Sequence, residues 1–313
     1  MTNTSINVFG SERKLPWISL LILVVFFIVG LFVGQFFGVV FSLLISGAGL
    51  DELLQLVSPP FTEEERIPLM MVQGFGAFGG FILGAGAYVR IVERKSPIIL
   101  FYFEQMDIKE VLLTLFIVMS FMMVNSFFIE WNLNMGFPSF MSGFENWAKT
   151  KEEELKVVTE FLTSFHSSGQ FIIAIFVIGI IPAIGEEYLF RGIIQNKLHL
   201  YLKNPHVAIW LTAILFSGFH LQFYGFIPRM FLGVLFGYLY YWSWNLWIPI
   251  IAHFINNAFT LTMIYMYQTG LTGMDIEKQE SLSWQYLILF GLLTGFLLYY
   301  FKRNMASVKT GYE

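Results

Sequence analysis

Long stretches without Asp, Glu, Lys or Arg divide this chain of 313 residues into apolar segments. A helix needs roughly 20 apolar residues to cross the hydrocarbon core of a bilayer. Six of the stretches therefore predict one crossing each, and the run 230–274 predicts two helices with a break near Trp244–Asn245–Pro249. None alternates apolar and polar residues as membrane β-strands do. The stretches cover residues 15–50, 67–89, 111–129, 161–185, 204–228, 230–274 and 281–301. This pattern predicts an all-α polytopic membrane protein, a bundle of about eight transmembrane helices.

The predicted helices form a single transmembrane domain over residues 1–313. We expect helices 1–3 within 1–130, a polar and amphipathic segment at 131–168, helices 4–7 within 169–270, and helix 8 at 281–303. The first apolar run is longer than the core of a secretory signal, so we expect it to be a retained helix. Lys and Arg concentrate on the inner side of the membrane when both termini are cytoplasmic, so the positive-inside rule predicts that orientation. We also expect the membrane to be a bacterial cytoplasmic membrane.

The polar segment contains one predicted helix. Lys149–Phe165 reads KTKEEELKVVTEFLTSF and places its apolar residues on one face at helical spacing. We expect an amphipathic helix that lies on the membrane surface. A lid over a membrane-embedded site is the alternative function for the same helix.

Composition agrees with a membrane protein and excludes several functions. Charged residues make up 13% of the chain, whereas soluble proteins usually carry about 25%. The net charge of −4 gives no basic surface for nucleic acid, so no nucleic-acid partner is expected. Cysteine is absent, which excludes disulfides, thiolate nucleophiles and cysteine-bound metals.

A few polar residues interrupt the predicted helices and are the candidates for function. An ionisable group inside a span costs roughly 2.5–3.5 kcal/mol on insertion, so such groups are expected to face the protein interior. They are Glu186, Glu187 and Arg191 after the apolar run 171–184, His220 in the next helix, and His253 with Asn257 in the seventh.

Helical spacing assigns different tasks to the two glutamates. Glu187 and Arg191 are four residues apart and can form an ion pair on one face. Glu186 is rotated by roughly 100° from Glu187, so Arg191 satisfies it less well. A carboxylate in such a low-dielectric site can serve as a general base. The alternative is that all three residues form a solvated helix end at the cytoplasmic interface.

The histidines complete a set that can activate water against a carbonyl group. His253 and Asn257 share one helix face, and both can stabilise an oxyanion. The alternative for a lone histidine such as His220 is a core residue that makes its hydrogen bonds within the protein and has no catalytic role. A zinc site made by Glu186, His220 and His253 is a chemical alternative. The Gly-x-Ser-x-Gly, His-Glu-x-x-His and phosphate-loop motifs are all absent.

These motifs resemble those of the CAAX protease and bacteriocin-processing family of intramembrane endopeptidases, also called CPBP or Abi proteins. Three ordered motifs carry the resemblance, which covers roughly residues 170–262. They are Glu186-Glu187-x-x-x-Arg191, Phe216-x-x-x-His220 and His253-x-x-x-Asn257.

The resemblance implies a role for each residue. Glu186 would activate water with the help of His220, and His253 and Asn257 would form the oxyanion site. In addition, Glu187 and Arg191 would be a structural pair, and Phe216 would pack beside the site. It implies a peptidase of the metal-free glutamic type without a cofactor, with zinc as the alternative. The expected substrate is a membrane-associated peptide or a lipidated protein C-terminus, met among membrane lipids.

Two other functions are compatible with the same residues. A non-catalytic membrane immunity or scaffold protein could keep them as a polar core. A secondary transporter could use the Glu and His side chains as a proton relay, although the chain shows no two related halves. The peptidase hypothesis also requires that Glu186 and His220 lie at the same depth in the membrane. Glu186 and His220 can meet at one depth if the fourth helix continues past Arg191 to about Leu200.

Overall fold

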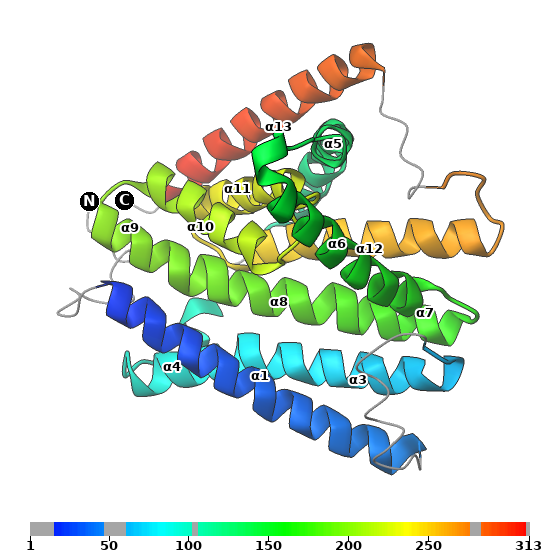
Figure 1. Ribbon diagram of the computed structural model, residues 1–313. Coiled ribbons are helices and arrows are strands. Elements are labelled where there is room, and N and C mark those ends of the chain that lie inside the picture. The colour runs from blue at the N-terminus through cyan, green and yellow to red at the C-terminus, as the bar shows by residue number, and fades with distance from the viewer. Residues whose placement is uncertain (1–15, 47–60, 102–105, 276–282, 311–313) are drawn as a thin grey trace. The chain divides into compact units, whose positions relative to one another are not determined.

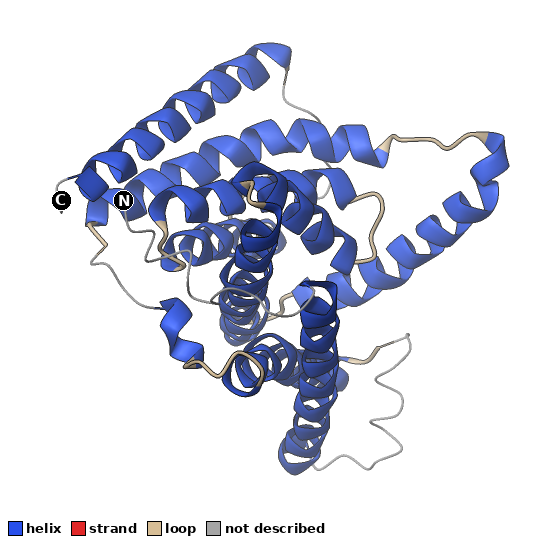
Figure 2. Cartoon of the chain, turned by 90° about the vertical axis from the view of Figure 1, so that its left-hand side faces the viewer, coloured by secondary structure: helices blue, strands red, loops and turns tan. Residues whose placement is uncertain are grey.

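The structure is a computed structural model that describes residues 16–46, 61–101, 106–275 and 283–310. Every regular element among these residues is a helix, and Figure 2 shows no strand in this part of the chain. Six of the described helices are long and apolar enough to cross a membrane. The prediction of an all-α polytopic membrane protein is therefore confirmed.

Two of the expected eight spans correspond to shorter helices. Helix α10 (Pro205–Phe219) has 15 residues, and α11 (Phe226–Ser243) has 18 and carries Arg229 in its first turn. The other six expected spans coincide with the long apolar helices. The orientation with cytoplasmic termini stays a prediction, and Arg13 and Lys14, which enter that argument, lie outside the described residues.

The chain forms two compact units, and the expected single domain stays a prediction (Figure 1). Unit 1 comprises the described residues up to Leu100, Leu155–Lys197 and Asn257–Met274. Unit 2 comprises Phe101–Glu154, Leu198–Asn256 and the described residues from 283 onward. The boundary falls inside three α-helices, which are α6 (Ser142–Thr163), α9 (Asn196–Leu202) and α12 (Trp247–Gln268).

Unit 1 is built on three long helical segments. The second and third are continuous helices with π-helical turns, and we call the third, Ser168–Leu202, the motif helix. The first is α1 (Pro16–Ser46). The second joins η2 (Glu63–Glu65), α3 (Arg66–Ala77), η3 (Phe78–Gly84) and α4 (Ala85–Ile91). The motif helix joins α7 (Ser168–Ala174), η6 (Ile175–Ile180), α8 (Ile181–Glu187), η7 (Tyr188–Gln195) and α9 (Asn196–Leu202).

Glycines set the close approach of α1 to the helix beside it in Figure 1. A Cβ atom added to Gly34 would overlap the carbonyl oxygen of Phe75, and one added to Gly30 would overlap that of Gly79. Gly30 and Gly34 are one turn apart, the Gly-x-x-x-Gly spacing that lets membrane helices pack backbone to backbone. The hydrophobic effect does not drive helices together in lipid, so their association depends on close van der Waals packing. The glycines allow this packing, and larger side chains would prevent it.

The motif helix also approaches its neighbour at a glycine. A Cβ atom on Gly185 would lie 2.6 Å from the Cβ of Phe81 in η3. Gly185 directly precedes Glu186, so the first motif begins where the motif helix packs closely against η3.

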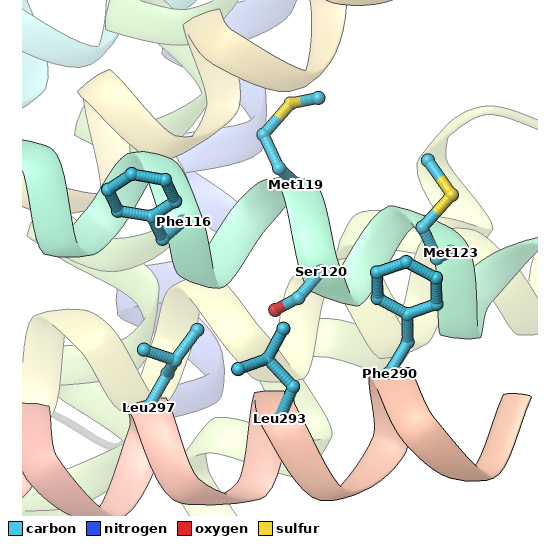
Figure 3. A pocket seen from close by; sticks show the side chains of 7 residues that line it. All are labelled: Phe116, Met119, Ser120, Met123, Phe290, Leu293 and Leu297. Atoms are coloured by element: carbon cyan, nitrogen blue, oxygen red, sulfur yellow. The ribbon is translucent and has the colours of Figure 1, made fainter. Parts of the chain in front are cut away.

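Unit 2 packs α10, α11 and the first part of α12 with α5 (Ile108–Leu133) and α13 (Trp284–Thr310). Its apolar core contains Ile117, Val118, Leu235, Phe236, Leu239, Ile248, Ala252, Phe301 and Met305. An apolar pocket of about 290 Å³ lies between α5 and α13 (Figure 3). The pocket is lined by Phe116, Met119, Ser120, Met123, Phe290, Leu293 and Leu297.

The predicted break near Trp244–Asn245–Pro249 is confirmed. Helix α11 ends at Ser243, and Trp244 takes a left-handed conformation with φ of 54°. The side-chain oxygen of Asn245 then accepts the backbone N–H of Trp247 at 3.0 Å, which satisfies a donor in the first turn of α12.

The charge-free run 204–228 holds more than the single helix we expected. Helix α10 ends at Phe219, a turn covers 220–225, and α11 begins at Phe226. Arg229 does not end a helix, because its guanidinium donates to the side-chain oxygen of Gln222 at 2.8 Å. The position of the charge alone therefore placed the helix boundary incorrectly.

The amphipathic segment forms the predicted helix, α6, which begins earlier than Lys149 and ends at Thr163. Its C-terminal half is fixed in unit 1 by the fully buried Arg66, which donates to Ser164 Oγ at 2.9 Å and to the carbonyl of Phe161. Gln268 of α12 adds a bond to the carbonyl of Thr163 at 3.1 Å. Whether α6 lies on the membrane surface or forms a lid stays a prediction.

We expect Gly34→Val to destabilise the protein, because the new side chain would push α1 away from Phe75. Overpacking costs about 1–3 kcal/mol, so the melting temperature in detergent should fall by several degrees. The control is Gly295→Val on α13, where an added Cβ has no atom within 4 Å. Equal melting temperatures for the two variants would contradict the proposed backbone contact.

Candidate active site

The first motif lies inside the motif helix, well before its end. Glu186 closes α8 with Glu187, and Arg191 lies in the π-helical turn η7. Glu187 and Arg191 are fully buried, and Glu186 is 8% exposed. This burial contradicts the alternative of a solvated helix end. The requirement that the fourth helix extend past Arg191 to about Leu200 is confirmed, because the motif helix ends at Leu202.

The predicted ion pair is present. Arg191 Nη1 donates to Glu187 Oε1 at 2.9 Å, and the side chains of both residues are fully buried. Glu187 is thus a direct partner of Arg191, as the four-residue spacing predicts.

His220 lies at the end of α10, where the chain leaves the helix. Its Nδ1 is 2.9 Å from the carbonyl oxygen of Phe216. A carbonyl can only accept a hydrogen bond, so Nδ1 carries the proton and Nε2 presents a lone pair in the neutral ring. The neutral His220 ring can therefore accept a hydrogen bond at Nε2. The ring is half-buried.

Unit 2 brings the two histidines of the motifs to one aromatic side chain. The Phe216 ring meets the His220 ring edge to face at 5.2 Å and the His253 ring at 6.0 Å between centroids. The other support of His253 is Phe236, whose ring stacks on it at 5.2 Å. His253 is 5% exposed. Phe216 thus contacts both motif histidines, and its place beside an active site stays a prediction.

Asn257 follows His253 by one turn of α12 and reaches the motif helix. Its Nδ2 donates to the carbonyl oxygen of Ile178 at 3.2 Å. Ile178 lies in η6, a π-helical turn two helical turns before Glu186. This bond holds the second half of α12 against the helix that carries the glutamates.

The structure divides the predicted site residues between the units. Glu186, Glu187, Arg191 and Asn257 belong to unit 1, whereas Phe216, His220 and His253 belong to unit 2. The Glu187–Arg191 pair forms as its spacing predicts, whereas a common target for His253 and Asn257 stays a prediction. One common site for Glu186 and His220 stays a prediction.

The hydrogen bond of His220 bears on whether Glu186, His220 and His253 could bind zinc. Histidine ligands usually donate their second ring nitrogen to a backbone carbonyl or carboxylate, as His220 Nδ1 does here. Within the described part of either unit, no group of three or more His, Asp or Glu side chains lies close enough to hold a metal ion. Zinc binding by Glu186, His220 and His253 thus stays an alternative.

Sequence reasoning missed the residues that hold the histidine in place. Ser217, which is fully buried, donates to the carbonyl of Phe226 at 2.6 Å and ties the end of α10 to α11. Asn132, at the end of α5, accepts the backbone N–H of Ile227 at 2.8 Å. Ser217 is within the second motif, so its position gave a local signal. Asn132 gave none, because its partner is 95 residues away.

One comparison with known proteins concerns this same part of the chain. Residues 168–259 match the Rce1-like family, described as type II CAAX prenyl endopeptidases. MroQ, a membrane-embedded CAAX protease of Staphylococcus aureus, is 35% identical over 95 residues, which are 28% of this chain and 38% of that protein. YpbD, an uncharacterized protein of Bacillus subtilis, is 31% identical over 107 residues, 32% of this chain and 52% of that protein.

The chain thus spans about half of the length of YpbD and less than half of MroQ. No solved structure matches it significantly. The matched residues include all three motifs, from the glutamates to Asn257.

We expect Glu187→Gln to destabilise the fold by about 3–5 kcal/mol, because it leaves the buried charge of Arg191 without its main carboxylate. Replacing both partners by Glu187→Gln with Arg191→Met removes that charge, so stability should partly return. Thermal unfolding in detergent checks both values. If the double variant loses as much stability as the two single variants together, the direct interaction between Glu187 and Arg191 is contradicted.

Proposed function

We propose that this chain, whose residues 168–259 match the Rce1-like family of type II CAAX prenyl endopeptidases, is an intramembrane endopeptidase. The observation that carries the proposal is the burial of Glu186 in the middle of a 35-residue apolar helix. Such a carboxylate is costly at membrane depth, and activation of water gives it a chemical task.

Glu186 is the general base in this proposal. It accepts a proton from a water molecule while the water oxygen attacks the carbonyl carbon of the peptide bond. His220, with its lone pair at Nε2, accepts a hydrogen bond from the same water and orients it. Glu186 then gives its proton to the leaving nitrogen as the carbon–nitrogen bond breaks.

His253 and Asn257 stabilise the negative oxygen of the tetrahedral intermediate. Stacking on Phe236 fixes the plane of the His253 ring. An amide nitrogen carries two hydrogens, so the bond from Asn257 to Ile178 is compatible with a second donation to the oxyanion. Donors that are held in place before the reaction are effective in a water-poor site.

The reaction takes place at the membrane. The substrate is a membrane-associated peptide or a lipidated protein C-terminus, and membrane lipid surrounds the apolar helices. The protein is integral to a bacterial cytoplasmic membrane, with both termini in the cytoplasm. The mechanism requires no cofactor, and zinc held by Glu186, His220 and His253 is the alternative, in which the ion would polarise the water.

We expect Glu186→Gln and His220→Ala to lower the cleavage rate by about 10²–10⁴-fold, the usual contribution of a general base and its partner. Purified protein in lipid nanodiscs is assayed with a quenched fluorescent peptide, with and without a prenylated cysteine. Glu153→Gln, on the exposed side of α6, is the control and should keep full activity. Full activity of Glu186→Gln would exclude it as the base.

A chelator distinguishes the two mechanisms. The metal-free mechanism predicts that activity survives prolonged treatment with a strong zinc chelator. Loss of activity that returns when zinc is added would instead establish the zinc alternative.

The non-catalytic and transport functions predict different outcomes. A scaffold would support the same cellular phenotype with Glu186→Ala and His220→Ala as without them, and purified protein would cleave no peptide. A proton-coupled transporter would show a pH-dependent flux in vesicles that requires Glu186.

A further inference from the structure

The turn that follows His220 has a strained backbone. Leu221 has φ of 55°, a left-handed conformation that leucine rarely adopts, and its side chain is 62% exposed. Burial of that side chain therefore does not hold the conformation. Such strain persists where the surroundings determine the backbone, and it is frequent at active sites. The contacts that impose it on residues 220–225 also determine where His220 lies.

Glu152, far away in the sequence, makes two of these contacts. Its Oε1 accepts a hydrogen bond from Gln222 Nε2 at 3.2 Å, and its Oε2 accepts one from the backbone N–H of Tyr224 at 3.3 Å. Each carboxylate oxygen of Glu152 thus holds a different point of the turn. Glu152 lies in α6, so these bonds attach the turn to another helix.

The charges on either side of Gln222 fix its amide group. Its nitrogen donates to Glu152, and its oxygen accepts from Arg229 Nη2 at 2.8 Å. A carboxylate and a guanidinium at opposite ends of the amide allow only this orientation, because a flipped amide would put its NH₂ group against the guanidinium. Charge-assisted bonds of this kind are stronger than neutral ones.

Aromatic packing joins the same turn to the start of α6. The ring of Phe223 lies 4.7 Å from that of Phe137 and 5.7 Å from that of Phe144. This packing is apolar and tolerates rotation of the rings. The two bonds of Glu152 to the turn, by contrast, are directional.

We propose that Glu152 is a positioning residue for His220, which it places through the turn and the relay from Gln222 to Arg229. Its carboxylate holds residues 222 and 224 and thereby the left-handed backbone of Leu221 directly after the histidine. The catalytic consequence rests on the proposed function, whereas the placement of His220 does not.

A charge-exchange series tests the relay. Glu152→Gln puts an NH₂ group against one of the two donors of the turn, and Gln222→Glu puts two carboxylates together. In the double variant, the new amide at 152 can donate to the new carboxylate at 222 and accept from Tyr224. The carboxylate at 222 keeps its bond with Arg229. Glu153→Gln, one residue away and exposed, is the matched control.

In the peptidase assay, Glu152→Gln and Gln222→Glu should each lower kcat by about 10- to 100-fold with little change in KM, because a small displacement of a catalytic group has an effect of this size. The double variant should recover most of the loss, which measures direct coupling of the two residues. Losses that simply multiply in the double variant would overturn the relay.

A second readout does not depend on activity. Carbethoxylation of His220 by diethyl pyrocarbonate, followed by mass spectrometry, reports the access to its ring nitrogen. We expect the rate to change in Glu152→Gln, to return in the double variant and to stay unchanged in Glu153→Gln. An unchanged rate in Glu152→Gln would overturn the placement. If the unmodified chain cleaves no peptide but this pattern holds, the proposed function fails and the placement stands.

Discussion

The buried ion pair between Glu187 and Arg191 is the interaction on which the rest of this structure depends. Two charges in an apolar helix are tolerated because they neutralise each other away from lipid. Their burial fixes which face of the motif helix points to the protein interior. Glu186, one residue earlier and 8% exposed, is carried to the same interior. A pair whose charges compensate each other thus accompanies a second carboxylate at membrane depth.

Local backbone features adapt the motif helix to this task. A π-helical turn begins directly after Glu187 and contains Arg191, and such turns are frequent at functional sites. Gly185 lets the helix approach Phe81 closely, just before the glutamates. The histidines are placed by other means, because His220 ends a helix and takes its tautomer from the carbonyl of Phe216.

The sequence predicts those features that depend on neighbours within a few residues. Apolar runs predict the helices, the four-residue spacing predicts the Glu187–Arg191 pair, and Asn245 marks the break before α12. Contacts between distant residues could not be predicted, since they depend on packing. The bonds of Glu152 to a turn 70 residues away and the close approach of Gly34 to Phe75 are of this kind. The end of α10 was placed incorrectly because Arg229 is accommodated inside the next helix.

The most direct test of this account measures whether Glu186 and His220 share one site. The chain has no cysteine, so Glu186→Cys with His220→Cys introduces the only two thiols. A short thiol cross-linker is applied in membranes, and mass spectrometry detects the linked peptides; His220→Cys with His253→Cys is the positive control. Side chains that hold the same water should be linked as readily as the control pair. Linkage of the control pair alone would contradict the account.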